Sequence, residues 1–204
     1  REWGNHGRGD GEFDWPGGIA VDGEANVYVA DFDNHRIQVF SRWIAQDLSH
    51  RDDQRGQSSP PPTRPIVTET PPVFLNEWGE YGDGDGEFNG PYGIAVADEG
   101  YVYAADGLNH RIQVFDLEGR FLREWGEYGG GDGEFDMPTG IALDGRGNVY
   151  VADAGNQRIQ VFDPEGRILQ EWGNYGRGDG EFNRPFGIGV DGDGNVYVTD
   201  TDAH

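Results

Sequence analysis

The chain has 204 residues, with 38 Asp and Glu against 15 basic residues, all of them Arg, and a formal net charge of −23. This length gives room for one domain or at most two. The charge argues against strong non-specific binding to nucleic acid or to an anionic membrane. The absence of cysteine excludes disulfides and thiolate metal sites. No apolar run is long enough to cross a membrane.

One sequence unit recurs along the whole chain. Glu-Trp-Gly begins at Glu2, Glu77, Glu124 and Glu171, so the copies start 75, 47 and 47 residues apart. Gly-Asp-Gly-Glu-Phe follows at the same place in each copy. A repeat of this length is typical of propellers and other repeat architectures. The first copy exceeds the others by 28 residues.

The extra residues of the first copy lie within residues 41–73. This segment holds six of the eleven prolines, set among polar and charged residues. Such a composition predicts a flexible insertion with polyproline character inside the first repeat. Two interpretations remain open: an inert spacer at a loop tip, or a docking peptide for a partner with a groove.

Within each copy the apolar residues alternate, as strands require. In the third copy the predicted strands are residues 140–144, 148–153, 158–162 and 168–172, separated by turns rich in Gly, Asp and Pro. Four short antiparallel strands in a repeat of this length predict one propeller blade. We therefore predict an all-β propeller, with about four blades visible, in a single domain that covers residues 1–204.

Three strings recur in register and carry a resemblance: Pro-x-Gly-Ile-Ala-Val-Asp, Asn-Val-Tyr-Val-Ala-Asp and Asn-His-Arg-Ile-Gln-Val-Phe. They resemble the NHL repeat, whose name records the residues found here at Asn34-His35 and Asn109-His110. Gln157 replaces the His in the third copy. The resemblance covers the chain except for the insertion. It implies a propeller of four-stranded antiparallel blades, usually six to a ring, in a family that includes RNA-binding proteins and peptide-amidating lyases.

The two ends of the chain bear on how complete the ring is. Residues 1–4 match the outer strand of a blade, and the fourth copy stops after its second predicted strand. We therefore expect a piece of a longer, six-bladed propeller. The alternative is self-association of copies through open blade edges.

Repeated polar residues are expected to serve the blade itself. His35 and His110 invite a zinc hypothesis, but copies related by rotation lie too far apart to share one ion, so we predict hydrogen bonds within loops. Asp191 begins a stretch similar to a calcium loop but without its closing Glu, and a hairpin turn explains it more simply. No metal or cofactor is therefore expected. A spacing of five predicts Asp–Arg pairs at Asp31 and Arg36, Asp106 and Arg111, and Asp153 and Arg158.

Positions that differ between copies are where a specific site can be built. They gather beside the proline that opens the first strand of each blade and in the loop between the second and third strands. Both places should lie on one face beside the central channel. Large apolar side chains there predict a binding surface, although the aromatic rings would also serve as a plug for the channel mouth. The predicted ligand-binding residues are Trp15, Phe32, Tyr92, Leu108, Met137, Thr139, Arg184 and Phe186.

These features favour a non-catalytic binding or scaffold module that recognises a protein, peptide or other ligand through this face of the propeller. The acidic charge favours a basic partner and disfavours nucleic acid and membrane insertion. The alternative is a lyase or hydrolase, similar to the peptide-amidating lyases, whose site is completed by blades outside this chain. The compartment stays open, with a secreted or cell-surface location preferred.

Overall fold

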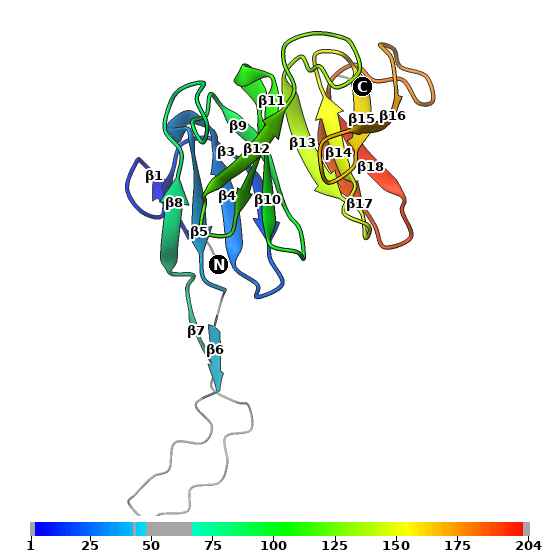
Figure 1. Cartoon of the computed structure of the whole chain (residues 1–204). Coiled ribbons are helices and arrows are strands. Elements are labelled where there is room, and N and C mark those ends of the chain that lie inside the picture. Colours follow the sequence, from blue (N-terminus) through cyan, green and yellow to red (C-terminus); the bar gives the residue numbers. More distant parts are fainter. Residues whose placement is uncertain (1–2, 43, 48–66, 202–204) are drawn as a thin grey trace, which may run out of the picture.

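The structure, a computed structural model, describes residues 3–42, 44–47 and 67–201. Its main body consists of antiparallel sheets in which strands follow one another in chain order (Figure 1). The first sheet contains β3 (Pro16–Val21), β4 (Val27–Asp31), β5 (Arg36–Phe40) and β8 (Phe74–Trp78). The second contains β9 (Pro91–Val96), β10 (Tyr101–Asp106), β11 (Arg111–Asp116) and β12 (Phe121–Trp125). The third contains β13 (Pro138–Leu143), β14 (Val149–Asp153), β15 (Arg158–Phe162) and β16 (Ile168–Trp172). A two-stranded sheet follows, with β17 (Pro185–Val190) and β18 (Val196–Asp200).

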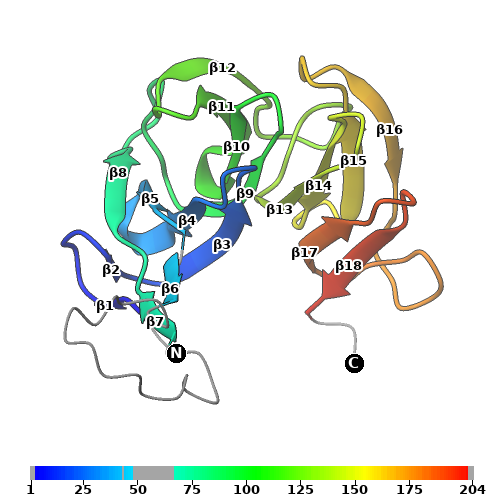
Figure 2. The ribbon, with the colours of Figure 1, turned by 90° about the horizontal axis from the view of Figure 1, so that it is seen from below.

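These sheets are the propeller blades that the repeat predicts. Figure 2 shows them side by side in an arc, with β3, β9, β13 and β17 innermost. The strands of the third copy agree with the predicted ranges to within two residues. The all-β propeller fold is therefore confirmed, while the number of blades in a full ring stays a prediction.

The second and third blades each insert an isoleucine of the inner strand into the blade before. Ile94 packs in one core with Tyr28 and Ala30 of the first blade, and Ile141 packs in another with residues of the second blade. Ile94 and Ile141 are 5% and 6% exposed. Ile19, at the same position in the first blade, is 65% exposed, because no described blade precedes it. The hydrophobic core thus lies between blades.

Glycine lets the inner strands approach one another closely. A Cβ atom on Gly93 of β9 would lie 2.3 Å from the carbonyl oxygen of Thr139 in β13. A Cβ on Gly140 would lie 2.4 Å from the carbonyl oxygen of Phe186 in β17. Side-chain atoms essentially never come so close to backbone, so the Gly of the Pro-x-Gly string is required where two blades meet at the channel.

Two segments differ from the sequence-based expectation. The ends of the insertion pair as antiparallel strands, β6 (Ile44–Asp47) and β7 (Val67–Thr70), whereas we expected no regular structure there. The Pro-rich centre of the insertion lies outside the described residues. Of the outer strand expected at residues 1–4, the described part is not in a strand; β1 (Asn5–His6) instead pairs in parallel with β2 (Glu12–Phe13). Parallel bridges such as Tyr81–Phe88 repeat this pairing in later copies.

The two ends of the blades carry different connections. We call the end with the short helices η1 (Phe32–Asn34) and η2 (Gly107–Asn109) the upper face. It also holds the loops that lead from an outer strand to the next inner strand. The opposite end is the lower face, which holds the hairpins between first and second strands. β6 and β7 project from it (Figure 1).

Candidate functional site

A buried ion-pair network supports the upper face of each of the first three blades. In the second blade, Asp106 Oδ2 accepts hydrogen bonds from Arg111 Nε at 2.9 Å and from Asn109 Nδ2 at 2.9 Å. Asp106 Oδ1 accepts one from the backbone N–H of Asn89 at 2.8 Å. Arg111 also donates to Glu124 at 2.7 Å. Burial raises the pKa of Asp106, and these donors oppose the rise. Equivalent Asp–Arg pairs in the other blades confirm the prediction, at 3.0 Å for Asp31–Arg36 and 2.9 Å for Asp153–Arg158.

The repeated histidines fix the start of the next blade. His110 Nδ1 accepts a hydrogen bond from the backbone N–H of Met137 at 3.1 Å, and His35 Nδ1 accepts one from that of Gly90 at 3.3 Å. Their predicted role as loop hydrogen-bond partners is confirmed. Among the described residues, no group of three or more His, Cys, Asp or Glu is placed to hold a metal ion. The expectation that no metal is needed stays a prediction.

The stretch that starts at Asp191 is a hairpin turn. Asp191 Oδ1 accepts from the backbone N–H groups of Asp193 at 3.0 Å and Asn195 at 2.8 Å. Its Oδ2 accepts from the Asn195 side chain at 2.8 Å and from the Tyr197 hydroxyl at 3.0 Å. Both carboxylate oxygens thus already have partners inside the turn, which supports the hairpin interpretation over a calcium loop.

Acid is expected to weaken this hairpin. The hydrogen bonds from Asn195 hold the pKa of Asp191 down at about 2, below the value of about 3.9 for an unfolded Asp. A carboxyl group with a lowered pKa stabilises the folded state above its unfolded pKa, and this contribution is lost as pH falls from about 4 to about 2. NMR chemical shifts of the Asp191 carboxyl group and of the Asn195 amide should both show a titration near pH 2. The variant Asp191→Asn should remove this titration from the Asn195 amide signal. Titration of the carboxyl near pH 4 would contradict this prediction.

A cavity of about 520 Å³ opens on the upper face, at the mouth of the channel. Phe32, Tyr92 and Phe186 line it and contact one another in a row. The ring centroids of Phe32 and Tyr92 are 4.4 Å apart. Those of Tyr92 and Phe186 are 5.7 Å apart, with the rings nearly perpendicular. Trp15 also lines the cavity and is 73% exposed. We call this the upper cavity; its wall combines side chains of the first, second and fourth blades.

The fold holds these rings in place through the backbone. Phe32 belongs to η1, while Tyr92 and Phe186 each follow the proline that opens an inner strand. Trp15 has a φ of 51°, a left-handed conformation that a bulky residue seldom adopts. Gly90 and Met137, at the same position in later copies, also have positive φ. The first three copies thus share this conformation, whereas Arg184 in the fourth does not have it. The first copy places an exposed Trp where the second has Gly.

Three polar groups complete the upper cavity: Asp33, Arg184 and Thr201. Burial raises the pKa of the Tyr92 hydroxyl; Asp33 raises it further, and Arg184 lowers it. Both charged groups therefore act on the same phenol oxygen. Asp33 and Thr201 are absent from the residues predicted above. Variation between copies, the signal used for the predicted residues, also finds Asp33 and Thr201, because their loop positions differ between copies.

Three of the predicted residues lie outside the upper cavity. Leu108 is 43% exposed on η2, and Met137 is half-buried beside His110. Thr139 is 1% exposed, and its hydroxyl lies 3.2 Å from the carbonyl oxygen of Pro185 and 3.1 Å from that of Phe186. We expected Thr139 to face a ligand on the surface. Instead Thr139, which follows Pro138, joins the third and fourth blades, because its side chain is turned against the next inner strand, β17.

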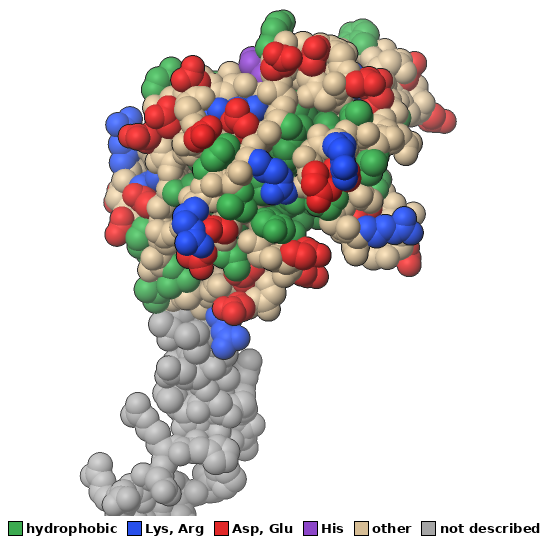
Figure 3. Space-filling model, viewed as in Figure 1, with side chains coloured by type: hydrophobic (Ala, Val, Ile, Leu, Met, Phe, Trp, Pro, Cys, Tyr) green, Lys and Arg blue, Asp and Glu red, His purple; other side chains and the backbone are tan. Residues whose placement is uncertain are grey.

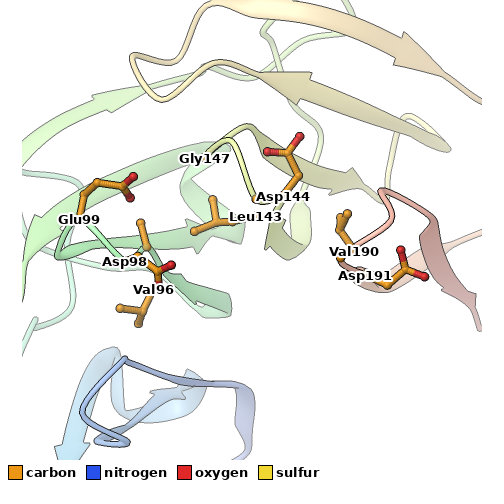
Figure 4. Close-up of a pocket in the computed structure, with 11 residues that line it drawn as sticks. Val96, Asp98, Glu99, Leu143, Asp144, Gly147, Val190 and Asp191 are labelled. Atoms are coloured by element: carbon orange, nitrogen blue, oxygen red, sulfur yellow. The ribbon is translucent and has the colours of Figure 1, made fainter.

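A second cavity, of about 270 Å³, lies on the lower face among the hairpins of the second, third and fourth blades (Figure 4). Asp98, Glu99, Asp144 and Asp191 bring four carboxylates to its wall. Asp144, like Asp191, already accepts hydrogen bonds from donors of its own turn. The hairpin turns thus account for Asp144 and Asp191. Figure 3 shows red Asp and Glu side chains spread over one side of the molecule, with fewer blue Arg among them.

The repeated strands match a known family model. The model described as NHL repeat matches residues 13–40, 88–115 and 135–162, which are the first three strands of three blades with the residues that lead into them. This chain is an NHL-repeat protein. The B-box type zinc finger protein ncl-1 of Caenorhabditis elegans is 41% identical over 69 residues, which cover 34% of this chain and 8% of that protein. The similarity is therefore between part of the repeat region of this chain and a small part of ncl-1.

Solved structures share the fold at low sequence identity. Hydrazine synthase of Kuenenia stuttgartiensis matches with a TM-score of 0.60 at 16% identity, covering 98% of this chain and 46% of that one. Virginiamycin B lyase from Staphylococcus aureus matches with a TM-score of 0.54 at 16% identity, covering 91% of this chain and 48% of that one. The NHL-repeat chain thus spans about half of each propeller-containing chain. At this identity the likeness extends to the fold alone.

Membership in the family bears on two of the expectations. A binding or scaffold role is consistent with the relatives. The exclusion of nucleic acid has no support from them, because the family includes RNA-binding members; it rests on charge alone. In the part of the chain that the structure describes, no helix is long and apolar enough to span a membrane.

Proposed function

We propose that this NHL-repeat chain is a non-catalytic binding module that takes a protein or peptide ligand into the upper cavity. The observation that carries this proposal is the row of aromatic rings at the channel mouth, built from residues that differ between the copies. Phe32, Tyr92 and Phe186 stay partly exposed, although the hydrophobic core of each blade is complete without them. Trp15 is held exposed in a strained backbone conformation. Rings of this kind, rimmed by polar groups, are typical of the centre of a binding patch.

The geometry gives the lyase or hydrolase alternative less support. Each repeated histidine already accepts a backbone hydrogen bond through Nδ1, and the Asp31, Asp106 and Asp153 carboxylates are committed to buried arginines. These repeated histidines and carboxylates are therefore not free to act as a general base beside the upper cavity. Loss of a lyase or hydrolase activity on chelation of a metal from this protein would favour the enzyme instead.

Truncation of the aromatic row is expected to weaken ligand binding. For a peptide selected from a random display library against this chain, Tyr92→Ala or Phe186→Ala should weaken affinity by about 30-fold, as for buried aromatic anchors in other interfaces. Isothermal titration calorimetry measures the effect, and thermal unfolding checks that each variant is folded.

Tyr175→Ala is the matched control for these variants. Tyr175 is 70% exposed on the loop that follows β16 and does not line the upper cavity. Its replacement should change affinity by less than about twofold, as expected of an exposed position outside the contact. An equal loss of affinity in Tyr175→Ala and Tyr92→Ala would place the binding surface elsewhere.

The net charge adds a basic partner to this proposal. A chain at −23 attracts cationic ligands over long range, and salt screens such attraction. Affinity for a basic ligand should therefore fall as salt rises, whereas an unchanged affinity would argue against a role for charge. A single-stranded oligoribonucleotide that binds with an affinity comparable to the selected peptide would contradict the exclusion of nucleic acid.

Self-association through an open blade side belongs to the same proposal. Ile19 and Val21 of β3 are 65% and 55% exposed, on the side that later blades bury against their predecessor. A blade from a second copy would cover them in the same way as Ile94 is covered. Light scattering of this chain should then show a mass above that of one copy, reduced by Ile19→Asp; a monomeric mass at all concentrations would reject the idea.

A further inference from the structure

The upper cavity carries one carboxylate and one guanidinium, although the chain as a whole is strongly acidic. Asp33 comes from the first blade and Arg184 from the fourth, and both face the same aromatic row. Tyr92 of the second blade lies within electrostatic reach of both. The local charge of the cavity wall is thus balanced, whereas the chain carries −23.

Both charged side chains are available to a ligand. Among residues 3–42, 44–47 and 67–201, no group forms an ion pair or a hydrogen bond with the side chain of Asp33 or Arg184, and both residues are exposed. Other charged groups of the upper face, such as Asp106 and Arg111, are paired and buried. An exposed charge without a partner is free to pair with an opposite charge on a ligand, which contributes mainly to specificity.

The backbone fixes where these two charges lie. The Asp33 backbone N–H donates to the carbonyl oxygen of Asp14 at 3.1 Å. The Arg184 N–H donates to Asp200 Oδ1 at 2.7 Å, and the Arg184 carbonyl accepts from the Thr201 N–H at 3.1 Å. The attachment points of both side chains are therefore pre-organised, which lowers the entropic cost of binding.

Neither charge is present in every copy, although Asp202, outside the described residues, stands at the position of Asp33 in the fourth copy. Leu108 and Gly155 take the place of Asp33 in the second and third copies. Trp15, Gly90 and Met137 take the place of Arg184 in the first three. The blade folds without either charge, so the pair is a feature of this cavity.

We propose that the upper cavity recognises a peptide segment in which an aromatic or aliphatic side chain is flanked by one basic and one acidic residue. This inference rests on the proposed function. The apolar side chain contacts Tyr92 and Phe186, the basic residue pairs with Asp33, and the acidic residue pairs with Arg184. A segment with two basic residues leaves Arg184 facing a like charge. A nucleic-acid strand brings its phosphates toward Asp33, which repels them.

The test uses three end-blocked pentapeptides that share a central Trp between two glycines. Their terminal residues are Lys and Glu, Lys and Lys, or Glu and Glu. NMR titration of the 204-residue chain should show the mixed-charge peptide binding about two- to fivefold tighter than either like-charge peptide, the scale expected of exposed ion pairs. High salt should reduce this preference.

Charge-reversal variants make the test specific. Asp33→Arg should shift the preference to the peptide with two Glu, and Arg184→Asp should shift it to the peptide with two Lys. The double variant carries both charges again and should restore the preference for the mixed peptide. Arg177→Asp and Asp85→Arg are matched controls, because they change the net charge equally at loop positions outside the upper cavity. They should leave the order of affinities unchanged.

The outcomes separate this inference from the proposed function. If all three peptides bind equally, and Tyr92→Ala abolishes binding, the charge pattern is wrong while the peptide site stands. If no peptide binds at any concentration tested, the proposed function and this inference both fail. If a single-stranded oligouridylate binds and Arg184→Asp weakens it, the cavity is a nucleic-acid site and the inference is overturned.

Discussion

Replacing Asp106 with Ala should lower the free energy of unfolding by about 3–5 kcal/mol, the scale for removing one partner of a buried ion pair. Asp106 is fully buried and accepts hydrogen bonds from Asn89, Asn109 and Arg111. The variant removes the acceptor that these three donors share, although buried Arg111 keeps its ion pair with Glu124. Buried donors left without an acceptor account for the largest part of the expected loss. Urea unfolding followed by circular dichroism measures the effect.

The matched control is an exposed pair in the same blade. Arg120 donates to Asp116 at 2.5 Å across a turn, but its side chain is 75% exposed. Because water solvates the Arg120 charge in either state, Arg120→Ala should change stability far less than Asp106→Ala. Similar losses in the two variants would show that the buried network contributes no more than a surface pair.

A methyl group on Gly93 should lower the free energy of unfolding by about 3 kcal/mol, at the upper end for overpacked sites. The new Cβ would lie 2.3 Å from the Thr139 carbonyl oxygen and 3.0 Å from the Ile141 backbone nitrogen. Both atoms belong to β13, whose backbone is fixed by its ladder with β14. The second and third blades must therefore separate at the channel. Because Tyr92 precedes this position, ligand affinity at the upper cavity should fall as well.

Gly189→Ala is the control for this effect. Gly189 lies in the inner strand β17, and a Cβ there meets no atom within 4 Å. The other copies have Ala20, Ala95 and Ala142 at this position. Because Ala also restricts the unfolded chain, the variant should be as stable as the parent or more stable, by up to about 1 kcal/mol. A loss in Gly189→Ala equal to that in Gly93→Ala would contradict the steric explanation.

Much of the blade could be predicted because its signals are local. Alternating apolar residues and Gly-rich turns predict strands such as residues 158–162, which the structure reproduces. The spacing of five between Asp153 and Arg158 spans one loop, so the pair could be expected without knowledge of the tertiary structure. Recurrence in each copy reinforced both predictions, since a residue that recurs with the blade is needed by the blade.

The site was predicted in part. Trp15, Phe32, Tyr92, Arg184 and Phe186 do meet at one cavity, as variation between copies suggested. Thr139 varies as well, yet it is buried between blades, because variation alone does not separate an exposed position from one facing the next inner strand. The strands β6 and β7 were missed because the Pro-rich composition between them outweighed their short apolar stretches.

The sequence by itself determined the repeat, the strands within it and the polar pairs that close each blade, since these depend on residues close together in the chain. The tertiary structure alone decided what the blades build jointly. Asp33, Tyr92 and Arg184 are separated by 59 and 92 residues along the chain, and only the arrangement of blades about a common channel brings them to one cavity. It also decided that glycines of the inner strands touch the next backbone, because that contact depends on how closely two blades pack.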